Sequence, residues 1–180
     1  TLNFLKVNFD SLLYDQKVLV DEIVLDSVSA LIFKDKTKPM DTMRMPAYLG
    51  QTIAAIRVPV LIRRVRATNV NLSNTERKPD GTNATVDISR ATLEVKNITN
   101  RAPNTSLSIQ ADAYIDGKVR FKAGLTFDYR KPQFTFEGVL DKFNLPDMNP
   151  LIQAYTPAKI NKGTADQILF SGKADQKQAT

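Results

Sequence analysis

The sequence predicts a mainly β protein: a long, curved and bulged antiparallel sheet, an open groove or half-barrel, with one or two short helices. Three observations support this fold class. Apolar and polar residues alternate with a period of two over much of the chain. The alternation slips by one residue at several points inside otherwise continuous strand patterns. Two short segments instead have helix signals: one carries apolar residues at helical spacing, and the other lies between an Asn-Pro pair and a later proline.

The clearest strand pattern is the stretch 107–129. Apolar side chains occupy alternate positions on both sides of Asp116-Gly117, and mostly polar side chains fill the positions between them. This pattern predicts two half-buried antiparallel strands of about 10 residues each. Because residues opposite each other share a face, we expect a three-residue loop, 115–117, with its glycine in the left-handed conformation. That loop places Ala113 opposite Val119.

The slips in alternation fall at four places. The first slip lies between the apolar groups 18–20 and 23–25, and the second lies between 23–25 and 28–32. The third lies between 58–62 and 65–67, and the fourth between 84–88 and 91–95. A one-residue slip inside a strand is typical of a β-bulge, which bends the strand and increases its twist. Repeated bulges predict a strongly curved sheet. The alternative at each place is a turn that ends the strand.

Two segments depart from the strand pattern. The spacing of Leu49, Ile53 and Ile56 predicts a short helix near 46–56, with Pro46 in its first turn. A second short helix is predicted at 149–156, opened by Asn149-Pro150 and stopped by Pro157. The second helix is expected either to cap one end of the curved sheet or to serve as an ordinary crossover between two strands.

Composition limits the chemistry that the chain can perform. The 180 residues include no Cys and no His, which excludes thiolate chemistry, disulfides and Ser-His-Asp triads. The seven glycines form no phosphate-binding loop. We therefore expect no catalytic, cofactor-binding or metal-binding residues. The remaining enzymatic alternative is polysaccharide hydrolysis by two carboxylates, and its candidates are Asp112, Asp128, Glu94 and Glu137.

The net charge of +6 permits binding to nucleic acid or to an anionic membrane surface. Arginines are densest at 57–66, which is also typical of a solvated strand face. Nucleic-acid binding requires aromatic and basic side chains on one surface. Here Phe121 and Phe127 alternate with Arg120 and Lys122, which places aromatics and cations on opposite faces. We expect no nucleic-acid partner.

The segment 136–176 resembles the closing part of AsmA-like proteins of Gram-negative envelopes. In those proteins a strand leads into a turn with the pattern [LM]-N-P-L, then a short helix, then a final strand. The matching turn here is Met148-Asn149-Pro150-Leu151. The stretches 18–36 and 56–73 resemble upstream strand units of the family. The other matching positions are Gly138, Leu140, Phe143, Leu145, Ile160, Gly163, Ile168 and Phe170.

The resemblance implies a large protein, anchored in the inner membrane and facing the periplasm. It also implies kinship to bridge-like lipid transfer proteins, whose long curved sheets form a groove lined by apolar side chains. We accordingly expect residues 1–180 to be a single β-rich module. The chain starts at Thr1 inside a strand pattern, so we expect it to be a fragment of a longer membrane-anchored protein.

These observations predict a non-enzymatic envelope module that contributes to lipid transport or outer-membrane assembly through an apolar concave sheet face. Lipid acyl chains and the rest of the longer chain are the expected partners, together with envelope proteins that the sequence does not identify. The alternative is a structural or adhesive β-module with a fully covered core and no ligand. The predicted groove lining consists of Leu107, Ile109, Val119, Phe121, Leu125, Phe127, Phe134 and Phe136.

Overall fold

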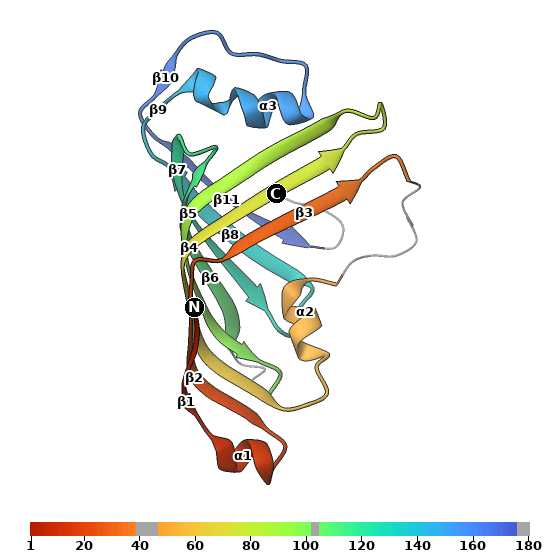
Figure 1. Cartoon of the computed structure of the whole chain (residues 1–180), viewed down its shortest axis with the longest axis vertical. Helices are drawn as coiled ribbons and strands as arrows, with labels where there is room; N and C mark the ends of the chain where they lie inside the picture. The colour runs from red at the N-terminus through yellow and green to blue at the C-terminus, as the bar shows by residue number, and fades with distance from the viewer. Residues whose placement is uncertain (39–46, 102–104, 176–180) are drawn as a thin grey trace.

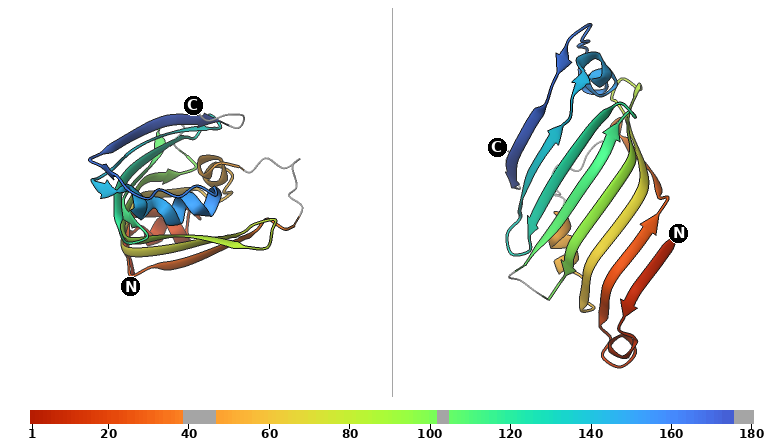
Figure 2. Two further views of the ribbon diagram at one scale, coloured as in Figure 1. Left: turned by 90° about the horizontal axis from the view of Figure 1, so that it is seen from above. Right: turned by 90° about the vertical axis from the view of Figure 1, so that its left-hand side faces the viewer.

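The computed structural model describes residues 1–38, 47–101 and 105–175. Within them nine strands form one open sheet, in the order β1-β2-β4-β5-β6-β7-β8-β11, with β3 beside the second half of β4. The sheet curves strongly, and α2 and α3 lie inside the curve (Figures 1 and 2). The elements are β1 (Leu2–Val7), α1 (Phe9–Leu13), β2 (Val18–Asp26), β3 (Ser29–Asp35), α2 (Leu49–Ala54), β4 (Val60–Arg77), β5 (Asn83–Thr99), β6 (Ser106–Ile115), β7 (Val119–Asp128), β8 (Gln133–Leu140), β9 (Phe143–Asn144), the 3-10 helix η1 (Leu145–Met148), α3 (Asn149–Tyr155), β10 (Thr164–Ala165) and β11 (Ile168–Asp175).

The mainly β, curved and bulged architecture is confirmed, but the sheet is mixed rather than wholly antiparallel. Strands β2 and β3 both pair with β4 in parallel, from Val18 beside Val60 to Asp35 beside Arg77. The chain between β3 and β4 includes α2 and is long enough to return to the starting end of the sheet, as a parallel neighbour requires. The other pairings of the sheet are antiparallel.

The hairpin of β6 and β7 has the predicted faces but a register two residues away from the predicted one. Ile115 pairs with Val119, and Ala113 therefore lies opposite Phe121 rather than Val119. Asp116 and Gly117 both adopt positive φ, and the Lys118 N–H donates to the Ile115 carbonyl. The turn is thus centred on 116–117 and Lys118 is the extra residue. A shift of two residues leaves every side chain on its face, so alternation alone does not distinguish the two registers.

One line of left-handed residues bends three neighbouring strands together. Ser27 follows β2, Asn69 lies in β4 and Arg90 in β5, and all three have φ between 53° and 59°. The register of β4 with β5 shifts after Ala67, and that of β5 with β6 shifts after Ser89. In Figure 1 the far halves of β4 and β5 turn away from the rest of the sheet, together with β3. The bulges predicted between 84–88 and 91–95 are confirmed here.

A second irregular line crosses the sheet closer to α1. Strand pairing is interrupted at one residue in each of four strands, and the register is the same on both sides of the interruption. The four residues are Lys6 in β1, Asp21 in β2, Arg63 in β4 and Asn97 in β5. Lys6 and Asn97 have positive φ. The predicted slips at 20–23 and 62–65 fall on this line, inside strands that continue without a turn. The slip at 25–28 coincides with the break between β2 and β3.

Both predicted helices are present. Helix α2 lies within the predicted 46–56, although Pro46 falls outside the described residues. Helix α3 covers Asn149–Tyr155 and begins with proline in its first turn, as expected. It lies on the concave side and contacts β5, and it also links β9 to β10. It therefore caps one end of the sheet and serves as a crossover at the same time.

The loop after α3 is held by the asparagine of the Asn149-Pro150 pair. The Asn149 side chain accepts a hydrogen bond from the Ile160 N–H and donates one to the Ile160 carbonyl, each at 2.8 Å. Gly163, at φ +127°, brings its backbone close to the Leu145 side chain, where a Cβ atom would lie 2.9 Å from Leu145 Cδ1. The Asn149 side chain thus uses both its donor and its acceptor to close this loop.

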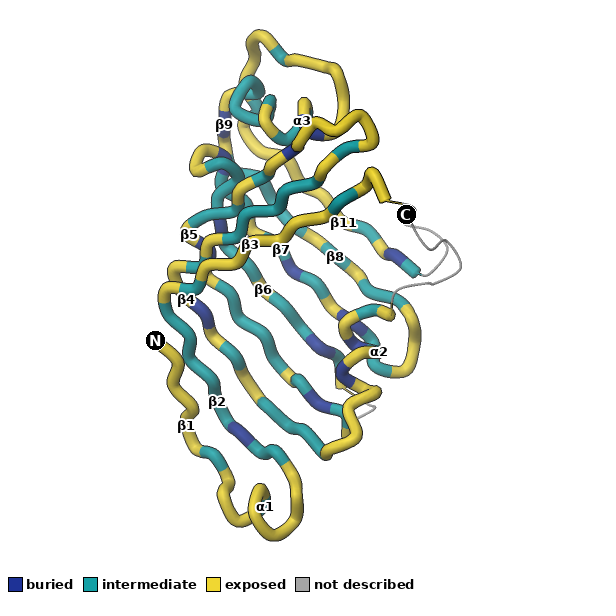
Figure 3. Tube along the Cα trace, turned by 45° about the vertical axis from the view of Figure 1, so that its right-hand side comes forward, coloured by how far each residue is buried: buried dark blue, intermediate teal, exposed yellow. Residues whose placement is uncertain are grey.

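The hydrophobic core lies under α2 on the concave side. Ile53 of α2 is buried against Leu107 of β6 and Phe127 of β7, with half-buried aromatic side chains around them. The ring of Phe134 stacks on that of Phe127 at 5.1 Å and meets Tyr48 edge-on at 5.4 Å. Figure 3 shows buried positions along the central strands, where they alternate with less buried ones, whereas β1 and β3 are almost wholly exposed.

Candidate functional site: the concave sheet face

The concave face of β6, β7 and β8 carries the side chains that sequence alternation assigned to the apolar face. Phe127 marks this face, because it packs against Ile53 of α2. Odd-numbered residues of β6 and β7 and even-numbered residues of β8 share it, since Leu125 pairs with Ile109 on one side and Phe136 on the other.

Four rows of concave side chains run across the strands, and one of them, Leu107, Phe127, Phe134 and Ala174, lies directly under α2. A second row, of mostly large side chains, lies beside α2, and another contains Ala113, Phe121, Leu140 and Ile168. Between them lies a row with four alanine or glycine residues, which we call the small-residue row. The row beside α2 is Val65, Val95, Ile109, Leu125, Phe136 and Gly172; the small-residue row is Ala67, Leu93, Ala111, Ala123, Gly138 and Phe170.

The predicted lining residues divide into two groups in the structure. Leu107, Val119 and Phe127 are buried, so they stabilise the fold and present little surface to a ligand. The other five are half-buried on the concave face: Ile109, Phe121, Leu125, Phe134 and Phe136. Four of these five lie beside α2 in two neighbouring rows, whereas Phe121 lies on the far side of the small-residue row.

Sequence analysis did not single out the small-residue row. Ala111 and Ala123 are opposite each other, and Ala123 is opposite Gly138 on its other side. All three residues are half-buried. Their positions within the alternation were visible in the sequence. Their alignment across three strands depends on the register of β6 with β7, which was predicted two residues away from the observed one, and on the register of β7 with β8, which was not predicted.

The opposite, convex face carries both polar and apolar side chains, among them the exposed Leu169. A hollow of about 450 Å³ lies over β6, β7, β8 and β11, where Gly124 has no side chain. Its lining combines polar side chains with apolar ones: Gln110, Lys122, Glu137 and Ser171 with Val139, Leu169 and Phe170.

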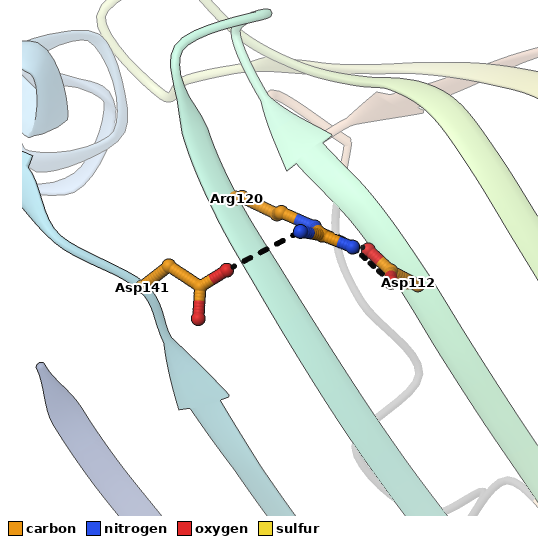
Figure 4. Close-up of polar contacts among 3 residues, drawn as sticks. All are labelled: Asp112, Arg120 and Asp141. Atoms are coloured by element: carbon orange, nitrogen blue, oxygen red, sulfur yellow. Dashed lines mark hydrogen bonds and ion pairs between the residues drawn. The ribbon is translucent and has the colours of Figure 1, made fainter.

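Three of the four carboxylates proposed for the enzymatic alternative, Glu94, Asp112 and Asp128, form ion pairs with Lys or Arg, and Glu137 lines the convex hollow. Arg120 binds Asp112 through two hydrogen bonds of 2.9 and 2.7 Å and lies 3.7 Å from Asp141 (Figure 4). The hydrogen bond from Arg120 lowers the pKa of Asp112, so this carboxyl stays ionised and is poorly suited to general-acid catalysis. Glu94 is paired with Lys96 at 2.7 Å, and that hydrogen bond lowers its pKa.

The arginine cluster at 57–66 is mostly occupied by ion pairs on the surface. Arg63 pairs with Asp21, Arg64 with Glu94, and Arg66 with Glu22, at 3.2, 3.3 and 2.6 Å respectively. These arginines are half-exposed or more, and the contacts join neighbouring strands. The arrangement fits the solvated strand face that the sequence left open as one interpretation.

None of the helices in the described ranges has the length and apolar character that crossing a bilayer requires. Comparison with protein-family models, curated proteins and solved structures found no match for this chain.

Proposed function

We propose that this protein is a non-enzymatic module that shields lipid acyl chains on its concave sheet face, as part of lipid transport or outer-membrane assembly. The observation that carries the proposal is the continuous apolar concave surface, in which larger side chains flank the small-residue row on both sides. An acyl chain lying along Ala111 and Ala123 would contact Leu125 on one side and Phe121 on the other, and it would end against the ring of Phe170, which covers Gly138.

The physical basis is the amount of apolar surface left on one face. Helix α2 covers one end of the concave face and α3 covers part of β5, while Phe121, Leu125 and Phe136 stay half-buried. Removing apolar surface from water contributes about 25 cal/mol per Å². A hydrocarbon chain seated against these side chains would therefore be stabilised without any charged or hydrogen-bonding contact.

The proposed setting follows from the resemblance to AsmA-like proteins. We propose that the module faces the periplasm as part of a longer chain anchored in the inner membrane. Further strands of that chain would extend the sheet at β11, where Leu169 is exposed. Envelope proteins that receive or deliver the lipid would complete the pathway.

The second candidate is a structural or adhesive module that binds no ligand. The observation that favours it is the burial of Leu107, Val119 and Phe127, because part of the predicted groove lining is already covered within the fold. In this case the half-buried remainder of the concave face would be covered in the assembled protein by other protein segments.

Native mass spectrometry of the protein purified from a Gram-negative host, with organic extraction of bound molecules, separates the two candidates. We expect stoichiometric phospholipid in the native protein. Phe121→Asp places a charge beside the small-residue row, and Ala123→Trp fills the row itself. Both changes are expected to reduce the bound lipid at least tenfold, while circular dichroism shows that the sheet survives.

Thr126→Asp is the matched control, because Thr126 is exposed on the convex face of the same strand. It should leave lipid binding unchanged. A native protein free of lipid would favour the structural module. Retention of lipid by both Phe121→Asp and Ala123→Trp would show that any lipid site lies elsewhere.

A further inference from the structure

Four chain connections lie together at one end of the strands. One joins β1 to β2, one precedes β4, one follows β5 and one joins β7 to β8. The pairing directions bring these strand ends to the same border of the sheet, which can be followed in Figure 2. We call this border the α1 rim, and its described residues are 8–17, 55–59, 100–101 and 129–132.

Hydrogen bonds hold the connections of the α1 rim side by side. The first residue of β2 donates its N–H to the carbonyl of the residue before β4, at 2.8 Å. The Asn100 side-chain amide donates to the carbonyls of Ile56 and Val58, at 2.6 and 2.8 Å. The Tyr129 hydroxyl accepts a hydrogen bond from the Thr99 N–H at 3.1 Å. The four connections therefore form one defined surface.

The α1 rim exposes large apolar side chains at the tips of its connections. Phe9 and Leu13 of α1 are 64% and 71% exposed, and the adjoining Tyr14 is 83% exposed. Ile56 and Val58 are exposed as well, although the strand that follows them, β4, lies inside the sheet between β2 and β5. The turns at the opposite end of the strands, 78–82, 116–118 and 141–142, contain no large apolar residue. Exposed apolar groups of this size mark an interaction surface.

Cations outnumber carboxylates on the α1 rim, five to three. Three of the cations, Arg57, Arg101 and Lys131, are exposed and form no ion pair with a carboxylate among the described residues. The turns at the opposite end hold three cations and three carboxylates. The cations of the rim are Lys17, Arg57, Arg101, Arg130 and Lys131, and the carboxylates in it or beside it are Asp10, Asp15 and Asp128.

A bilayer surface is the partner that fits this combination of side chains. Interfacial sites place apolar side chains at the boundary of the acyl chains and cations beside the phosphate groups. Tyrosine suits that boundary, because its ring is apolar and its hydroxyl stays in the headgroup layer. The core of a protein–protein interface is instead depleted of charge, whereas Arg57 stands between Ile56 and Val58. The excess of cations favours anionic phospholipid over neutral phospholipid.

We propose that the α1 rim docks this protein on a bilayer that contains anionic phospholipid, with the exposed side chains of α1 in the headgroup layer. The docking is reversible, because one short helix and a few cations bury too little apolar surface for permanent anchoring. The inference goes beyond the lipid-shielding function and does not require a lipid on the concave face.

Absence of tryptophan from the chain permits a direct test. Leu13→Trp places the only tryptophan in α1. Its emission should shift to shorter wavelength when vesicles of phosphatidylcholine and phosphatidylglycerol are added, and brominated acyl chains should quench it. Tyr155→Trp is the matched control, because Tyr155 is exposed in α3 at the other end of the molecule (Figure 1), and it should show neither change. Added salt should weaken the association, since it screens the cations.

Co-sedimentation with the same vesicles measures the contribution of each kind of side chain. Leu13→Asp and the double variant Arg57→Glu, Lys131→Glu should each weaken vesicle binding about tenfold. The three side chains are exposed, so both variants should keep the native circular dichroism spectrum. Lys162→Glu, in the exposed loop after α3, is the charge control and should bind like the native protein.

The result for Phe121→Asp separates this proposal from that of the concave face, because this variant should bind vesicles as the native protein does. A native protein that stays in the supernatant with anionic vesicles would overturn the docking proposal. Undiminished binding by Leu13→Asp and by the double variant would overturn it too, as would a spectral shift in Tyr155→Trp in place of Leu13→Trp.

Discussion

At the residue scale, two glycines on the facing strands β7 and β8 have opposite surroundings. Gly138 lies under the ring of Phe170, where a Cβ atom would be 2.3 Å from Phe170 Cζ and 2.6 Å from the Lys122 carbonyl oxygen. Gly124 faces the convex hollow, where a Cβ would approach only the end of the Gln110 side chain, at 2.9 Å. The Lys122 carbonyl belongs to the backbone and cannot move aside, whereas the end of the flexible Gln110 side chain can. Glycine is therefore required at Gly138 and optional at Gly124.

We predict that Gly138→Ala lowers the free energy of unfolding by about 1–3 kcal/mol, the usual cost of overpacking. Gly124→Ala should change it by less than about 1 kcal/mol, because alanine also restricts the unfolded chain. Urea denaturation followed by circular dichroism measures both. Equal effects of the two substitutions would contradict the assignment of the Lys122 carbonyl as the obstacle.

At the element scale, the bend of the sheet depends on side chains that hold left-handed residues in place. The Asp26 carboxylate accepts hydrogen bonds from Thr68 at 2.6 Å, Asn69 at 2.9 Å and Ser27 at 3.0 Å. Asp26 thus connects β2 to β4 at the line where both strands turn. These hydrogen bonds, led by that from Thr68, lower the pKa of the Asp26 carboxyl. The bend is stabilised by a polar contact on the surface as well as by packing.

We predict that Asn69→Val destabilises the protein by about 1–2 kcal/mol, since a β-branched residue is strained at positive φ. Asn69→Gly should cost less, because glycine adopts this conformation freely and loses only the side-chain hydrogen bond. Thermal unfolding of the two variants measures the difference. If Asn69→Gly were the more damaging change, the hydrogen bond to Asp26 would matter more than the backbone conformation.

At the scale of the whole molecule, carboxylates tie the curved sheet together at several places. Asp112 is held by Arg120 between β6 and β7, and Glu94 is held by Lys96 and Arg64. The pKa of both carboxyls is lowered, in each case chiefly by the side-chain hydrogen bond to the cation. A carboxyl with a lowered pKa in the folded state stabilises the fold above its unfolded pKa, and this contribution is lost as the pH falls through the folded value.

We therefore predict that the free energy of unfolding is nearly constant from pH 7 to about pH 5 and falls below about pH 4, where unfolded carboxyls begin to bind protons. Urea denaturation at a series of pH values measures this dependence. Arg120→Gln should make the acid loss smaller, because the Asp112 pKa then returns toward its ordinary value. Arg57→Gln is the control and should leave the pH profile unchanged.

Local chain geometry explains how much of this fold and candidate site could be predicted from sequence. Side chains alternate between faces in any strand, so the apolar face of β6, β7 and β8 was predicted without knowledge of their partners. Apolar spacing and proline position likewise predicted α2 and α3. The bulge at Arg90 and the interrupted pairing at Arg63 were detectable because the alternation reverses at each of them.

Contacts between distant segments decided the rest. Whether β2 and β3 pair with β4 in parallel depends on the path of the chain between them, and a two-residue change of hairpin register leaves every face unchanged. The alignment of Ala111 with Ala123 follows from that register, and the alignment of Ala123 with Gly138 follows from the pairing of β7 with β8. Asp112 lies opposite Lys122, and Arg120 reaches it diagonally. The sequence by itself determined which side chains share a face. Only the tertiary structure decided which of them are neighbours across strands, because pairing depends on residues far apart in the chain.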